Sequence, residues 1–371
     1  MLAATLLCAS AAAQQRPLAA KASASPVPLW DVKLSPDPNL SMNFSDNLLL
    51  LSTQCDADGN PYASIFSPEE PYRQVAAFTK KGVVTLATND MTEIPEPNMT
   101  SIFIGDSALY ALVSGVDNAK KVVVTEHDEN GEELKLSRTV GERRDFIARF
   151  DLDGSYRGSI KLDAGFRPMQ IAVFGSGDFA VAGVDEESVP RAWILNARGQ
   201  FLTYLELPND ITDYRRKNVE KNFADSEGLD AATDVIAMFA AFYAYHGNIL
   251  LVRSGNVSPI YEIREGGEAR EVRVKAPDGL QIGRLIPSDT NWLIDFRGKL
   301  LDKKTDAIYE VSPETGEMMR QYHIESEEGS KDEVSCMVQG SLIGLRHSKG
   351  RLTVVRGTAE PHQNKAPPNP Q

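Results

Sequence analysis

The chain has 371 residues, of which 42% are hydrophobic and 25% charged, so it can build a sizeable core and global disorder is excluded. Its 39 basic and 52 acidic residues give a formal net charge of -13. This charge opposes nucleic acid, because nucleic-acid-binding proteins draw most of their affinity from Lys and Arg placed on phosphates. Nucleic acid is therefore set aside as a partner.

Residues 1–13 predict a secretion signal, because a short apolar run ends in the small residues Ser10 to Ala13. The run lacks the Lys or Arg that usually precedes it, so the alternatives are a start further upstream or a merely apolar terminus. Export predicts a periplasmic or extracellular protein. Residues 14–28 are rich in Ala, Ser, Lys and Pro and predict a flexible linker. No other segment approaches 18 consecutive apolar residues, so no transmembrane segment is expected.

From residue 29 the chain alternates between short apolar strands and turn residues. Residues 29–34 predict one strand without a hairpin partner. Apolar residues then alternate with small or polar ones in a hairpin that recurs along the chain, at residues 40–51, 101–115, 169–183, 241–255, 283–298 and 335–347. A second recurring hairpin turns on Gly82, Gly154, Gly199, Gly267 and Gly316, with apolar residues at shared offsets. This recurrence indicates a repeat protein of four-stranded modules.

The last module lacks a fourth strand, because only residues 351–356 follow its hairpin before a Pro-rich tail. The single strand at residues 29–34 can supply the missing one, which would close the chain into a ring. We therefore predict an all-β fold, a six-bladed β-propeller over residues 29–356 whose last blade is closed by the N-terminal strand. Residues 357–371 are expected to be a disordered tail.

The runs FDLDGSYRGSIKL (150–162) and RPMQIAVFGSGDFAVAG (167–183) place a Pro before an inner strand and a Gly at an outer hairpin. In these features residues 29–356 resemble the six-bladed NHL and TolB-like propellers of exported bacterial proteins. The resemblance implies a fold and no single activity, because such propellers include lactonases, lyases, signalling modules and binding platforms.

The two cysteines outside the leader, Cys55 and Cys336, fall in neighbouring sheets at the two ends of the predicted ring. An oxidising compartment permits a disulfide between them. The sequence favours the other interpretation, two separate small hydrophobic side chains, because isolated cysteines in a large chain commonly take that role.

Three long segments predict an elaborated face of the ring, because all would join second to third strands or one blade to the next. They are residues 55–72, 115–145 and 208–234. Long loops in compact domains are commonly functional. Within the last segment, Val219 and Phe223 suggest a short helix that either covers the central opening or packs beside the ring. The charged residues 126–143 predict a solvated β-ribbon.

Candidate ligand-binding residues are Arg167, Arg284 and Arg297, which should all point toward this face, with Tyr214 in the segment that could cover it. Basic groups near a central opening could orient an anionic ligand. The alternative is that each arginine pairs with a neighbouring carboxylate such as Asp163 or Asp278.

No motif of known chemistry is present. Asp56, Asp58 and Asn60 resemble the opening of a calcium loop but lack its closing Glu, so an ordinary turn is favoured and no metal site is predicted. The histidines at 127, 246, 323, 347 and 362 form no ligand pair by spacing. No cofactor and no catalytic residue is assigned. The leading hypothesis is an exported scaffold that binds an unknown protein or small-molecule ligand, and the alternative is a metal-assisted lactonase- or lyase-type propeller enzyme.

Overall fold

The structure is a computed structural model of the chain. It describes residues 27–45, 48–66, 73–86, 88–105, 107–127, 133–162, 166–185, 190–205, 240–253, 257–286, 288, 290–298, 307–327 and 329–362. The predicted secretion signal, Tyr214 and residues 208–234 lie outside these ranges, as do nearly all of the predicted linker and most of the predicted tail.

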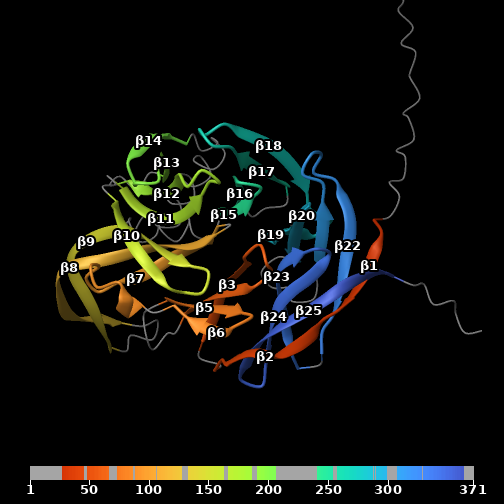
Figure 1. Ribbon diagram of the computed structural model, residues 1–371, viewed down its shortest axis with the longest axis horizontal. Helices are drawn as coiled ribbons and strands as arrows, with labels where there is room; N and C mark the ends of the chain where they lie inside the picture. Colours follow the sequence, from red (N-terminus) through yellow and green to blue (C-terminus); the bar gives the residue numbers. More distant parts are fainter. Residues whose placement is uncertain are drawn as a thin grey trace, which may run out of the picture.

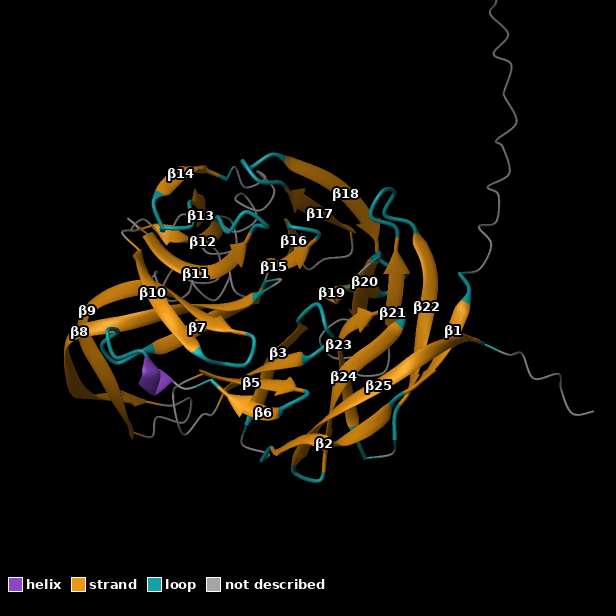
Figure 2. Cartoon of the chain, in the orientation of Figure 1, coloured by secondary structure: helices purple, strands orange, loops and turns teal. Residues whose placement is uncertain are grey.

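Strands make up almost all of the regular structure, apart from one 3-10 turn, η1 (Thr88–Asp90) (Figure 2). Four sheets have four strands each. The first contains β3 (Leu49–Cys55), β4 (Pro61–Phe66), β5 (Arg73–Thr79) and β6 (Gly82–Thr85), and the second contains β7 (Asn98–Ile104), β8 (Ala108–His127), β9 (Glu133–Asp151) and β10 (Tyr156–Leu162). The third contains β11 (Phe166–Val173), β12 (Phe179–Asp185), β13 (Pro190–Leu195) and β14 (Phe201–Tyr204). The fourth contains β15 (Ala240–Tyr245), β16 (Asn248–Arg253), β17 (Val257–Ile263) and β18 (Ala269–Lys275).

A fifth sheet has nine strands. They are β1 (Leu29–Lys33), β2 (Ser35–Asn43), β19 (Leu280–Ile286), β20 (Trp292–Gly298), β21 (Ala307–Val311), β22 (Met318–Glu325), β23 (Lys331–Val338), β24 (Ser341–Ser348) and β25 (Arg351–Pro361). Strand β1 joins two meanders of this sheet, because it pairs in parallel with β22 and antiparallel with the end of β25.

The sheets follow one another around a closed ring (Figure 1). Contacts join β5 to β7, β7 to β11, β11 to β15, β16 to β19, β19 to β23, and finally β23 back to β3. The innermost strands β3, β7, β11, β15, β19 and β23 surround the centre. This is a β-propeller arrangement, in which ring closure leaves the sheets without long exposed edges.

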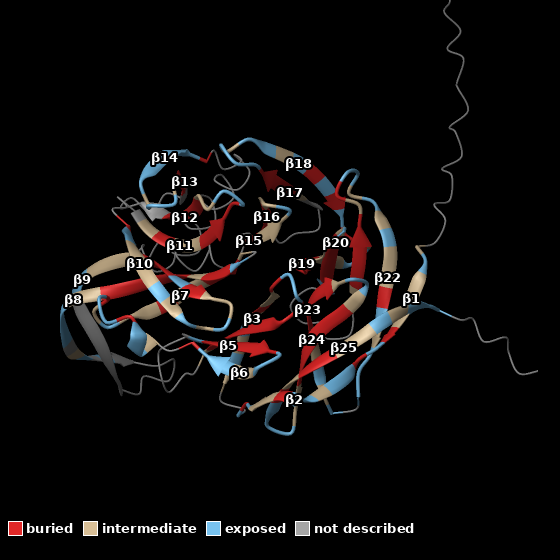
Figure 3. Cartoon of the chain, viewed as in Figure 1, coloured by how far each residue is buried: buried red, intermediate tan, exposed pale blue. Residues whose placement is uncertain are grey.

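The core lies between adjacent sheets. Residues of β12 such as Phe179 and Val181 are fully enclosed, because the middle strands of a sheet are covered on both faces (Figure 3). The outer strand β18 alternates instead, with Val272 and Val274 buried and their neighbours more exposed. Burying such side chains contributes about 1.5–3 kcal/mol each.

The predicted hairpins are confirmed in every repeat but the first. The turn residues Gly82, Gly154, Gly199, Gly267 and Gly316 all have positive φ, the left-handed conformation that favours glycine. In the first repeat the prediction is wrong by one strand. Residues 40–43 belong to the outer strand β2, and the inner hairpin is β3 and β4.

The predicted long loop at residues 55–72 is therefore also wrong. Its first part is the tight turn from Cys55 to Pro61, and β4 occupies residues 61–66. The error arose because the apolar residues of β4 follow an Asp-Gly-Asn-Pro turn that could equally open a loop.

Ring closure by the N-terminal segment is confirmed, with a correction to the strand that does it. Residues 35–43 pair with Arg351–Arg356 of β25 as the outer strand, while Leu29–Lys33 pairs with residues 359–361 beyond them. Pro36 and Pro38 are tolerated in β2 because an outer strand does not need every backbone N–H for pairing. The end of β25 also extends into residues predicted to be a disordered tail.

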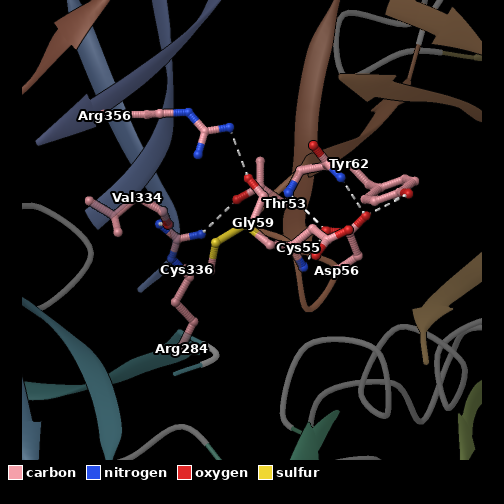
Figure 4. Close-up of a disulfide and its surroundings, with 11 residues drawn as sticks. Thr53, Cys55, Asp56, Gly59, Tyr62, Arg284, Val334, Cys336 and Arg356 are labelled. Atoms are coloured by element: carbon pink, nitrogen blue, oxygen red, sulfur yellow. Dashed lines mark hydrogen bonds between the residues drawn. A yellow bond between two sulfur atoms is a disulfide. The ribbon is translucent and has the colours of Figure 1, made fainter. Parts of the chain in front are cut away.

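Two further features distinguish the ring. Residues 115–127 and 133–145, part of a predicted insertion, form a long two-stranded ribbon that continues β8 and β9, which confirms the expected β-ribbon at 126–143 on its described residues. Cys55 and Cys336 form a disulfide, so the favoured interpretation of two separate side chains is wrong (Figure 4). The bridge joins the first innermost strand to the last.

Candidate functional site

A cavity of about 1110 Å³ occupies the centre of the ring. All six innermost strands, β3, β7, β11, β15, β19 and β23, contribute residues to its wall. Arg167, near the start of β11, and Arg284, past the middle of β19, both line this cavity. A concave site with convergent polar groups is the usual form of a ligand-binding site.

In five of the innermost strands, a β-bulge interrupts the pairing with the next strand of the sheet. The strand residue that the pairing register skips is Leu51 in β3, Thr100 in β7, Met169 in β11, Gly283 in β19 and Ser335 in β23. Bulges bend a strand and re-aim its side chains, and they are enriched beside functional sites. Four of these residues, all but Ser335, line the cavity.

Arg284 braces three innermost strands on one side of the cavity. Its Nη1 donates to Glu333 Oε1 at 2.9 Å and to Thr53 Oγ1 at 3.3 Å, and its Nη2 donates to the Val334 carbonyl at 2.7 Å (Figure 4). Its Nε donates to Asp295 Oδ2 at 3.2 Å. Arg284 therefore holds β19 to β23 and β3, close to the disulfide, and its main role is structural.

Arg297 shares Asp295 with Arg284 but is more open to the cavity. Its Nε and Nη2 donate to Asp295 Oδ2 at 3.1 and 2.9 Å. The Arg297 side chain is 48% exposed, whereas that of Asp295 is 7% exposed. Its aliphatic part lies across Gly283, where an added Cβ would stand 2.7 Å from Arg297 Cδ. The bulged glycine thus makes room for this arginine.

A second arginine cluster lies across the ring, formed by Arg143 of β9 and Arg167 of β11 around Asp145. Arg143 donates from Nε and Nη2 to Asp145 Oδ1 at 3.0 and 2.8 Å. The Arg143 side chain is 31% exposed and that of Asp145 is 12% exposed. Burial raises the pKa of the Asp145 carboxyl, while the hydrogen bonds from Arg143 and the charges of Arg143 and Arg167 oppose that rise. Arg143 and Arg167 both line the cavity.

Both clusters have the same arrangement of charge. The carboxylates Asp145 and Asp295 are buried behind the arginines, and the guanidinium groups of Arg143 and Arg297 are the more exposed members. A ligand that enters the cavity meets these two guanidinium groups before the carboxylates that pair with them, although Asp332 and Glu333 also line the wall. The cavity thus offers guanidinium donors in a chain that carries a net charge of -13.

Uncharged side chains separate the two clusters. They include Thr53, Ser101, Gln170 and Phe242, with the Tyr243 hydroxyl. Burial raises the pKa of Tyr243, and the charges of Arg284 and Arg297 oppose this rise. Tyr243 is therefore a neutral phenol at neutral pH.

The structure brings together three of the four residues predicted to bind a ligand, Arg167, Arg284 and Arg297, whereas Tyr214 lies outside the described residues. Of the predicted partners, Asp163 lies outside the described residues, and the carboxylates that pair with Arg284 are Asp295 and Glu333 and not Asp278. Sequence reasoning missed Arg143, Asp145 and the bulges. Pro168 and Gly283, residues that disfavour regular inner strands, were the available signals for the bulges.

The predicted turn at Asp56 is confirmed. Asp56 Oδ1 accepts the backbone N–H of Asp58 and Asn60, and Oδ2 accepts Asn60 Nδ2 at 2.8 Å and the Tyr62 hydroxyl at 3.3 Å. These bonds satisfy the carboxylate with protein donors. Burial, followed by the charge of Asp56, raises the pKa of Tyr62.

Among the residues that the structure describes, no three His, Cys, Asp or Glu side chains are grouped so as to hold a metal ion. His323 and His362 instead each place Nδ1 against a different oxygen of Asp31, at 3.2 and 2.7 Å. A second cavity of about 550 Å³ opens among the short turns near Gly177 and Gly247. It is smaller than the central one. Within the described ranges, no helix has the length and apolar character needed to cross a membrane.

No protein-family profile matches the chain, and no curated protein matches its sequence. Solved structures that it resembles include YCF48 bound to D1 peptide, with 8% identity, a TM-score of 0.43 and coverage of 92% of this chain and 100% of that one. Another is the Neurospora crassa Pan2 WD40 domain, with 9% identity, a TM-score of 0.39 and coverage of 87% and 96%. A third is Porphyromonas gingivalis dipeptidyl peptidase 4, with 11% identity and a TM-score of 0.36. The match covers 80% of this chain and 47% of that protein, so the chain spans about half of its length.

Proposed function

We propose that the protein is an exported scaffold that binds an anionic ligand in its central cavity. The observation that carries this proposal is the repeated arrangement of partly exposed arginines over buried carboxylates in the cavity wall. Arginine is suited to this task because its planar fork can donate two hydrogen bonds to a carboxylate or phosphate.

We count the ring as six blades. The meander β19–β22 is one blade, and β23–β25 with β2 is another, joined to the first by β1. Supporting this count, β19 and β23 each carry a bulge in their first pairing, as β3, β7 and β11 do. We also propose that the ring is of the NHL or TolB-like kind, because the sequence runs at 150–162 and 167–183 resemble blades of those propellers.

Export is supported by the disulfide between Cys55 and Cys336, because disulfides persist mainly in oxidising compartments. If residues 1–13 are a cleaved leader, N-terminal sequencing of protein recovered from the bacterial periplasm should begin at Gln14. Mass spectrometry of unreduced protein should find no free thiol. An intact Met1 together with three free thiols, those of Cys8, Cys55 and Cys336, would contradict export.

Binding can be tested with citrate, a compact tricarboxylate, at constant ionic strength. A ligand that binds only the folded state raises the unfolding temperature by an amount that grows with the ratio of its free concentration to its Kd. We expect citrate to raise the Tm of the wild-type protein, and Arg143→Ala and Arg297→Ala each to reduce that increase.

The matched control is Arg264→Ala, which removes the same charge from an exposed turn between β17 and β18, outside the cavity wall. It should keep the full response to citrate. An equal loss of response in all three variants would show that net charge, and not the cavity, governs the effect.

A further inference from the structure

The arginines of the cavity form two separate clusters, one on each side of the ring. Arg143 and Arg167 come from β9 and β11, and Arg284 and Arg297 come from β19 and β20. In Figure 1 β9 and β11 lie on the left of the ring, and β19 and β20 lie to the right of its centre. The sheet that contains β15 separates them on one side of the ring, and the sheet that contains β3 on the other.

In each cluster a carboxylate fixes the orientation of one arginine, Arg143 or Arg297, so that its guanidinium group is ready to bind an anion. The Nε and Nη2 groups of Arg143 are held by Asp145, and those of Arg297 by Asp295. Because two donors of each fork are fixed by a buried carboxylate, the side chain loses little further freedom when a ligand binds. For Arg143, the Nη1 group has no partner among the described residues.

The lining between the clusters would suit an uncharged spacer. Ser101, Gln170 and Phe242 belong to three different innermost strands and offer hydroxyl, amide and aromatic surface. A ligand with a single anionic group would satisfy one cluster and leave the other to water.

We infer that the cavity binds a small molecule with two anionic groups, one held at Arg143 and Arg167 and the other at Arg297, joined by an uncharged spacer. This inference rests on the proposed function and specifies its ligand. Linking two anionic groups makes the second contact intramolecular, so the molecule binds more tightly than either half alone.

The experiment uses the full disulfide-bonded chain and a series of straight α,ω-dicarboxylates, from succinate to dodecanedioate, with the monocarboxylate of the same carbon number as the partner of each. Affinities are measured by calorimetry at constant ionic strength. We expect one spacer length to bind best, and at that length the dicarboxylate to bind at least about tenfold more tightly than its monocarboxylate.

Substitutions in the two clusters test whether each one binds one end of the ligand. Arg143→Ala and Arg297→Ala should each reduce the dicarboxylate affinity to that of the monocarboxylate. Each should affect the monocarboxylate much less, because it can still use the other cluster. Gly283→Ala keeps every charge but places a Cβ against Arg297, so it should weaken the dicarboxylate selectively. Arg264→Ala, again, should change neither affinity.

The outcomes separate this inference from the proposed function. Equal affinities for dicarboxylate and monocarboxylate at every length would overturn the inference and leave anion binding in place. Absence of binding by both series and by citrate would overturn both. Tight dicarboxylate binding that survives both arginine substitutions would place the ligand elsewhere and overturn the inference.

Discussion

The side chains of Glu262 and Glu310 occupy equivalent places in neighbouring meanders. Each is buried on a third strand and accepts a hydrogen bond from an asparagine near the start of the second strand, Asn248 at 2.8 Å and Asn291 at 2.6 Å. Each also pairs with an arginine on the fourth strand, Arg270 or Arg320. The same arrangement therefore occurs in both meanders: a buried carboxylate and its hydrogen-bond donors join three strands of one sheet.

We expect Glu310→Ala to lower the free energy of unfolding by about 2 kcal/mol, because it leaves Asn291 and Tyr322 without their acceptor inside the sheet. Urea denaturation measures this change. The control is Glu314→Ala, since the Glu314 side chain is 82% exposed and that of Glu310 is 3% exposed. Similar losses in the two variants would contradict a special role for the buried carboxylate.

The Tyr322 hydroxyl should ionise at a higher pH than an ordinary tyrosine. Burial, and then the hydrogen bond to Glu310, raise its pKa to about 12. A pKa raised in the folded state means that the neutral phenol stabilises the fold below its unfolded pKa of about 10, and that this contribution is lost as the pH rises toward about 12. Absorbance titration of wild type minus Tyr322→Phe should show this late ionisation. A difference midpoint near 10 would refute it.

Strand β1 fastens the chain ends by an ionic contact as well as by backbone pairing. Asp31 lies in register with His323 of β22 and with Glu360 of β25 and contacts both His323 and His362. The hydrogen bond from His362, opposed by some desolvation and helped by His323, lowers the pKa of Asp31. The exposed carboxylate thus joins the N-terminal strand to β22 and to the C-terminal end.

The lowered pKa of Asp31 predicts sensitivity to acid. Its contribution to stability is present above the unfolded pKa of about 4 and is lost as the pH falls through the lower folded pKa. Urea midpoints measured from about pH 6 to about pH 2 should therefore fall more steeply for wild type than for Asp31→Asn, which has no carboxyl to titrate. Parallel curves would show that the contact contributes nothing.

For the whole molecule, closure of the ring depends on bonds between the first and last innermost strands. The disulfide between Cys55 and Cys336 spans 281 residues of sequence, and Arg284 and Arg356 add hydrogen bonds to Thr53 and Gly59 close to it (Figure 4). A covalent link across so long a loop removes much of the conformational freedom of the unfolded chain.

We expect the double variant Cys55→Ala/Cys336→Ala to lose about 2–5 kcal/mol of stability. Substituting both residues avoids a free thiol, and addition of reductant to the wild type should give a similar loss. Reductant should not affect the double variant. If the variant keeps wild-type stability, the noncovalent contacts of Arg284 and Arg356 are sufficient to close the ring.

The all-β class, the repeated hairpins and the glycines of the outer turns could be predicted from the sequence. These features are local, because strand alternation and positive φ are properties of a few consecutive residues. The sequence also predicted that Arg167, Arg284 and Arg297 point toward one face of the ring, and all three line the central cavity.

The folded chain was needed to show which segment closes the ring, whether the cysteines are bridged, and which carboxylates lie behind the arginines. Residues 40–43 have the alternation of an inner strand yet form part of β2 beside β25, and Cys55 forms a disulfide with a residue 281 positions away. Asp145 and Asp295 gain their importance from burial beside Arg143 and Arg297. Such pairings depend on contacts between residues remote in sequence, and no local pattern of residue types encodes them.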